Sequence, residues 1–114
     1  MGKAKTFVTV KFRQDGVHYC PGADDYLKHP HRHEFHFTVW LEVFHDDSEV
    51  EFIALKERLQ EYMRELLEGR LVLYSCENIA ELLVKRPGEM YHPDRAVRVW
   101  VEEDGENGGC VEAG

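Results

Sequence analysis

Histidines are concentrated near the start of the sequence, and their spacing points to metal chemistry. Five of the seven lie between residues 18 and 36. His31 and His33 open an alternating segment, so both imidazoles leave the same face of the predicted strand. Zn²⁺ accepts such nitrogen ligands, and its catalytic sites combine three protein ligands with an open water position. His18 is the best third ligand, because a hairpin connection brings the residues before His31 back beside it.

The other histidines in and near this stretch are interpreted as surface residues. His36 is expected on the opposite strand face from the His31 and His33 pair. His29 precedes a proline, which favours extended backbone there. His45 falls in a polar turn.

Two cysteines occupy positions where a thiol could take part in chemistry. Cys20 follows His18 by two residues and is either a thiolate near the metal or a packed thiol. Cys76 lies at a predicted helix start, where the helix dipole lowers the pKa of a thiol. The alternative for Cys76 is a buried, small apolar residue.

Glu103 ends a predicted strand on the face that carries its valines, where a carboxylate needs a partner. One interpretation places Glu103 at a pocket rim, accepting hydrogen bonds from the N–H groups of a ligand. The other is a strand-end residue that reaches solvent. Glu102 takes the same role if the register shifts by one residue.

Periodic patterns divide the chain into strands and helices that would position these residues. Apolar residues alternate from 31 to 44, as in a half-buried strand. Ser48 and Glu51 fit a capping box for a first helix, and Ser75 is expected to cap a second helix that Pro87 ends. The first helix is expected to bury Phe52, Leu55, Leu59, Tyr62 and Leu66. The predicted elements are strands over 6–14, 31–44, 95–103 and 110–113, a short extended piece over 71–74, two helices before and after it, and a long irregular loop over 15–30.

This order of elements predicts an α+β fold in which two antiparallel hairpins carry both helices on one face of the sheet. Such a small sheet leaves two exposed edges, which must be covered or paired. Pairing with the edges of other copies would remove them. The sequence therefore predicts a homo-oligomer.

Composition bounds the class of protein. The 114 residues fit a single domain, 1–114. A formal net charge of −8 repels phosphate backbones, so nucleic acid is not the expected partner. No apolar run reaches the roughly 18 residues of a membrane helix, so no membrane partner is expected. Three widely spaced cysteines do not indicate a secreted disulfide framework, and a cytoplasmic protein is expected.

Five features in sequence order resemble the 6-pyruvoyl-tetrahydropterin synthase family, whose queuosine-pathway branch is 6-carboxy-tetrahydropterin synthase. They are the strand order, the His31-Arg-His33 motif, the helix openings over 50–56 (VEFIALK) and 75–81 (SCENIAE), and the late strand ending in Glu103. The match covers nearly the whole chain.

The resemblance implies a tunnelling fold, in which ββααββ subunits join edge to edge into a barrel with sites between subunits. It assigns zinc to His18, His31 and His33, and the pterin anchor to Glu103. It implies a lyase-type reaction on dihydroneopterin triphosphate or a related pterin or purine-like molecule, with zinc orienting the substrate side chain for proton transfers.

The sequence departs from the family at its proton-transfer groups. The family's cysteine stands four residues before the first histidine of the motif, where this chain has Leu27, and the family's Asp-His pair is missing from 68–74. Cys20 is the candidate base that would replace the thiol. Two functions follow: a zinc-dependent lyase, or a metal- and heterocycle-binding module that has lost these groups. A third hypothesis is an oligomeric structural protein with surface histidines.

Overall fold

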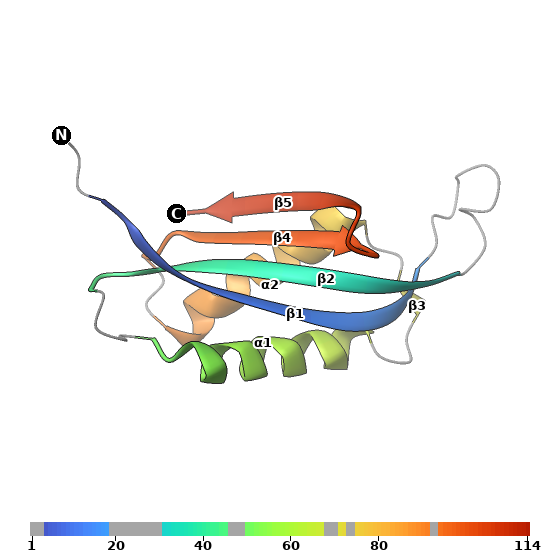
Figure 1. Cartoon of the computed structure of the whole chain (residues 1–114), viewed down its shortest axis with the longest axis horizontal. Coiled ribbons are helices and arrows are strands. Elements are labelled where there is room, and N and C mark those ends of the chain that lie inside the picture. The colour runs from blue at the N-terminus through green and yellow to red at the C-terminus, as the bar shows by residue number, and fades with distance from the viewer. Residues whose placement is uncertain (1–3, 19–30, 46–49, 68–70, 73–74, 92–93) are drawn as a thin grey trace.

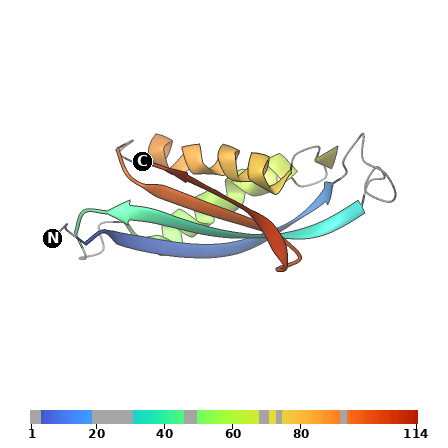
Figure 2. The same ribbon diagram turned by 90° about the horizontal axis from the view of Figure 1, so that it is seen from above.

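The computed structural model describes residues 4–18, 31–45, 50–67, 71–72, 75–91 and 94–114. Both helices lie on the same face of one twisted sheet, and the opposite face carries no helix (Figures 1 and 2). The elements in chain order are β1 (Thr6–His18), β2 (His31–Val43), α1 (Phe52–Leu67), β3 (Leu71–Val72), α2 (Cys76–Met90), β4 (Val97–Glu103) and β5 (Asn107–Ala113).

The strand order in the sheet is β3-β1-β2-β4-β5. The four long strands pair antiparallel, which confirms the predicted α+β class with two helices. The sheet is not wholly antiparallel, however, because the two residues of β3 pair parallel with Val17 and His18 at the end of β1. No described helix is long and apolar enough to cross a membrane.

Alternation along the strands builds the core, as the pattern predicted. The odd-numbered residues of β2 from Phe35 to Val43 are buried, and so are Val97, Val99 and Val101 of β4. Side chains two residues apart share a face of a strand, so both sets point to the helix-covered face. The core therefore runs the length of the sheet, and Glu103 follows the valines on the same face.

The first strand is longer than predicted. Residues 15–18 continue β1, where the sequence analysis placed the start of an irregular loop. Asp15 and Gly16 suggested a turn, but Gly16 instead allows a close approach: a Cβ there would lie 2.9 Å from Cε2 of Phe35. The missing side chain makes room for the Phe35 ring, so the strand continues to His18.

The first helix begins later than the predicted capping box. Glu51 caps it, because its carboxylate accepts the Ile53 and Ala54 N–H groups at 3.0 and 2.7 Å; Ser48 lies outside the described residues. The buried stripe is Leu55, Leu59, Met63 and Leu67. Phe52, expected in the core, is 57 % exposed; the helical repeat places it in line with this stripe, but it is the first residue of the helix.

The second helix starts as predicted and ends later. The Ser75 hydroxyl accepts the Asn78 N–H, and the Asn78 side chain accepts the Ser75 N–H, which together form a capping box. Pro87 does not end the helix; the Tyr91 N–H still bonds to the Pro87 carbonyl at 2.9 Å. Pro87 is buried, and its packing offsets the one helix hydrogen bond that proline cannot donate.

A tight turn joins β4 to β5. The Glu106 N–H donates to the Glu103 carbonyl at 3.0 Å, and both central residues, Asp104 and Gly105, have positive φ (56° and 73°). Asp-Gly at two positive-φ positions is the composition of a type I′ hairpin turn. The turn is shorter than the interval from 104 to 109 left between the last two predicted strands, because β5 already begins at Asn107.

Candidate functional site

The described part of the predicted metal site lies where β1 and β2 end beside the β4–β5 turn. The β1–β2 register pairs His18 with His31 and Gly16 with His33. The backbones of the three predicted ligands are therefore adjacent. The side chains of His18 and His31 lie outside the described part of the structure, as does Cys20.

His33 is held between two carboxylates that come from the end of β4. Its Nδ1 is hydrogen-bonded to Oδ2 of Asp104 at 2.8 Å, and its Nε2 lies 3.7 Å from Oε2 of Glu103. The His33 side chain is only 16 % exposed, and its ring meets the Phe35 ring edge-on, with centroids 6.2 Å apart. One face of His33 thus contacts the core while its two nitrogens face acidic groups.

Glu103 lies on the helix-covered face, as predicted, and Glu102 does not. The β2–β4 register places Glu103 opposite Phe35 and Glu102 opposite His36. The Glu103 side chain is 30 % exposed, so it neither enters the core nor extends freely into water. This partial exposure is compatible with both interpretations, a pocket rim and a strand end that reaches solvent.

Asp104 is a site residue that the sequence analysis missed. Its carboxylate accepts the Glu34 backbone N–H at 3.0 Å as well as the His33 Nδ1–H. The bond from the Glu34 N–H, with that from His33 second, holds the pKa of Asp104 below its usual value. The sequence could have indicated this residue, because Asp104-Gly105 is a typical turn pair and follows Glu103 directly. A second carboxylate was therefore to be expected close to Glu103.

Cys76 contradicts the expectation of an activated thiol. Although it occupies the first position of α2, the pKa of its thiol is raised to about 12, first by burial and then by the charges of Glu103, to which the thiol hydrogen-bonds, and of Glu77. Burial and these negative charges outweigh the helix dipole, which by itself lowers the pKa of a thiol. The alternative interpretation, a buried small residue, fits Cys76.

Among the described side chains, no group of three or more His, Cys, Asp or Glu could hold a metal ion by itself. This leaves the assignment of zinc to His18, His31 and His33 a prediction, since two of those side chains are not described. The bland interpretation of His36 agrees with the structure: it lies on the opposite face, with its Nε2 2.9 Å from Oε1 of Glu34. His45 is exposed.

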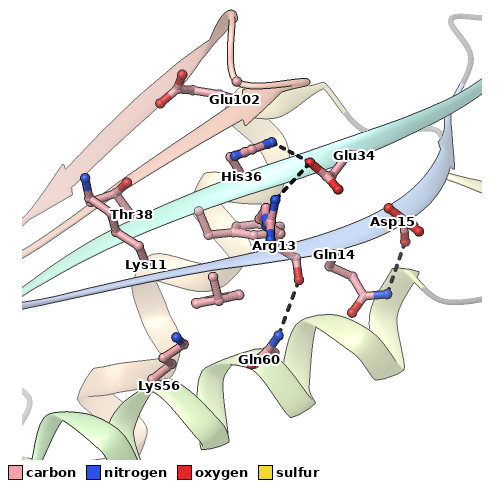
Figure 3. Close-up of a pocket in the computed structure, with 13 residues that line it drawn as sticks. Lys11, Arg13, Gln14, Asp15, Glu34, His36, Thr38, Lys56, Gln60 and Glu102 are labelled. Atoms are coloured by element: carbon pink, nitrogen blue, oxygen red, sulfur yellow. Dashed lines mark hydrogen bonds and ion pairs between the residues drawn. The ribbon is translucent and has the colours of Figure 1, made fainter.

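A hollow extends from the helix-free face of β1 and β2 around the edge of β1 to α1 (Figure 3). Its volume is about 890 Å³. Lys11 and Arg13 from β1 line it together with Lys56 and Gln60 from α1, and the Gln60 amide donates to the Arg13 carbonyl at 3.4 Å. The sequence analysis did not single out these residues, because exposed alternate positions of a strand look like ordinary surface.

The chain matches no protein-family model, and no curated protein matches it significantly. The fold and the geometry of the site therefore carry the functional argument.

The state of Cys76 gives a direct prediction. At about pH 8, a thiol of pKa about 12 is ionised in roughly one molecule in 10⁴, and the thiolate is the reacting form. Iodoacetamide should therefore alkylate Cys76 at least about ten-fold more slowly than the exposed Cys110, as measured by peptide mass spectrometry. In denaturant the two rates should converge. Equal rates in the folded protein would contradict the burial of this thiol beside Glu103.

Proposed function

We propose that the chain is a divergent tetrahydropterin-synthase-like protein that holds zinc on His18, His31 and His33 and binds a pterin-like heterocycle through Glu103. Its activity is a zinc-dependent, lyase-type reaction on dihydroneopterin triphosphate or a related substrate. The observation that carries the proposal is the position of His33, which lies between Asp104 and Glu103 at the strand end where His18 and His31 pair.

The donor chemistry at this position fits zinc. Metal-ligating histidines usually donate their second ring N–H to a carboxylate or carbonyl, and His33 does so to Asp104 at 2.8 Å. The remaining nitrogen, Nε2, is the atom that would bind the metal. When bound, zinc would polarise oxygen atoms of the substrate side chain and make neighbouring protons easier to remove.

Glu103 fits the role of heterocycle anchor. A pterin or guanine-like ring presents adjacent N–H donors, and one carboxylate can accept both. Glu103 is partly buried at the end of β4, with the neutral Cys76 thiol hydrogen-bonded to it. A thiol that stays protonated can donate to the carboxylate without competing for the ring donors, so it supports a fixed acceptor.

The proposal includes association of subunits through the sheet edges. In the described part of the chain, β5 has a neighbouring strand only on its β4 side, and β1 is flanked by β3 only at Val17 and His18. Lys11, Arg13 and Lys56 line the hollow at the β1 edge together with Asp15, and exposed Glu106 precedes β5, whose Glu112 pairs with Arg98. Attraction between the basic residues at β1 and Glu106 would favour a head-to-tail contact, which forms a ring where the rotation between subunits closes.

A second candidate function has its own support. The chain lacks the family's cysteine, having Leu27 instead, and the described cysteine nearest the site, Cys76, is held neutral. A binding module that retains the metal and the heterocycle but not the reaction agrees with this. Turnover of dihydroneopterin triphosphate by zinc-loaded protein separates the two: product formation supports the enzyme, and tight pterin binding without product supports the module.

Removal of two ligands tests the metal site. The double variant His31→Ala/His33→Ala should lose its metal, because one remaining imidazole cannot hold zinc tightly, while its circular dichroism spectrum stays close to that of the parent. Elemental analysis of untagged protein measures the metal. The matched variant His36→Ala/His45→Ala should keep it. Retention of one metal per subunit after loss of His31 and His33 would refute the assignment.

Substitution of adjacent glutamates tests the anchor. Glu103→Gln keeps the size but replaces an acceptor oxygen with an NH₂ donor that opposes a ring N–H, at a cost of about 1–3 kcal/mol. Pterin affinity, measured by titration calorimetry, should fall about ten-fold or more, with metal content unchanged. Glu102→Gln, on the other face, should have little effect. Equal affinities for both variants and the parent would exclude a pterin at Glu103.

Sedimentation velocity tests the edge pairing. The parent should sediment as an oligomer at micromolar concentration, and Lys56→Glu should weaken the association because it reverses a charge beside the β1 edge. Lys85→Glu, an equal change at an exposed position of α2, should leave it unchanged. A parent that is monomeric under these conditions would contradict the barrel.

A further inference from the structure

Both the backbone and the side chain of Asp104 are hydrogen-bonded to β2, in addition to the bond that closes the β4–β5 turn. Its backbone adopts a left-handed conformation (φ 56°), and its N–H donates to the Glu34 carbonyl at 2.7 Å. In return, the Glu34 N–H donates to Oδ1 of Asp104 at 3.0 Å. The Asp104 carboxylate thus takes the place of a strand carbonyl opposite Glu34, and its second oxygen, Oδ2, is brought to Nδ1 of His33 at 2.8 Å.

The direction of the last hydrogen bond follows from the charge of Asp104. An ionised carboxylate only accepts hydrogen bonds, and Oδ1 of Asp104 already acts as an acceptor for the Glu34 N–H. The proton of the His33–Asp104 bond therefore belongs to Nδ1 of His33. In the neutral imidazole, Nε2 then carries the lone pair.

We infer that Asp104 is a positioning residue, which holds His33 as its Nδ1–H tautomer and so directs the Nε2 lone pair toward a metal. The inference deepens the proposed function and rests on His33 being a zinc ligand. Asp104 itself would contact neither zinc nor the heterocycle, and it acts on the metal through His33.

The turn alone does not account for an aspartate. Glycine and asparagine also accept the positive φ of this position, so the backbone conformation leaves three residue types open. Only a carboxylate offers two acceptor oxygens, one for the Glu34 N–H and one for the His33 Nδ1–H. Asparagine can satisfy the first, but its NH₂ group would then face Nδ1.

The same turn couples the metal ligand to the heterocycle anchor. Glu103 and Asp104 are consecutive, and they approach opposite nitrogens of one imidazole, Glu103 near Nε2 and Asp104 at Nδ1. Fixing Asp104 on Glu34 therefore also fixes where Glu103 begins its side chain relative to His33. Metal and heterocycle would meet at a spacing that this turn sets.

The variant Asp104→Asn tests the inference. It tolerates the positive φ and keeps an acceptor for the Glu34 N–H, but its NH₂ donor at Nδ1 should shift His33 toward the Nε2–H tautomer. ¹⁵N NMR of the imidazole in metal-free protein at alkaline pH reports the tautomer. Zinc affinity, measured by competition with a chelator, should fall about 10- to 100-fold, the usual cost of losing such a partner. Glu106→Gln, the same charge change in the same turn, should leave both readouts at the parent values.

The two readouts separate the inference from the proposed function. An Nε2–H tautomer in the parent, or a tautomer unchanged by Asp104→Asn, would overturn the role of Asp104. If His33 is the Nδ1–H tautomer in the parent and changes in Asp104→Asn, but the parent binds no zinc, the role of Asp104 stands and the zinc site is refuted. Weaker zinc binding in Glu106→Gln equal to that in Asp104→Asn would overturn the inference too, because net charge would then explain the loss.

Discussion

β1 and β2 pair without interruption from Thr6 opposite Val43 to His18 opposite His31. Because side chains alternate, a slip of one residue would turn the apolar face of β2 to water and the polar face to the helices. Gly16 adds a steric constraint, since only a glycine beside the Phe35 ring lets that ring fill the end of the core. The relative backbone positions of His18, His31 and His33 follow from this register.

At the Phe35 end of the core, the buried apolar side chains are followed by charged and polar ones. Phe35 is fully buried, and its neighbours one pleat along β2 and directly across on β4 are His33 and Glu103. Burying a charge alone is costly, whereas burying it with partners is tolerated. Here Asp104 and Glu103 face the His33 nitrogens, and Cys76 stays neutral beside them, so this edge of the core is polar without isolated charges in its interior.

The alternation of apolar and polar residues predicted which face of each strand is buried, but it did not predict contacts between strands. The buried faces of β2 and β4, and the side of the sheet on which Glu103 lies, follow from alternation within each segment. The contact between His33 and Asp104 joins residues 71 positions apart and needs both the β2–β4 register and the left-handed turn. Competition between local and tertiary effects explains the errors, because burial overrides the dipole at Cys76 and packing carries α2 past Pro87.

The charges around His33 bear on the order in which ligands would bind. Glu103, Asp104 and Glu77 surround this end of the sheet, and carboxylates raise the pKa of Cys76 by disfavouring a further negative charge. The same field attracts a divalent cation and repels a triphosphate, an asymmetry that grows where water is excluded. A bound zinc ion would reverse the sign of the field at Nε2. Under the proposed function, an anionic substrate is therefore compatible with this site only after the metal has bound.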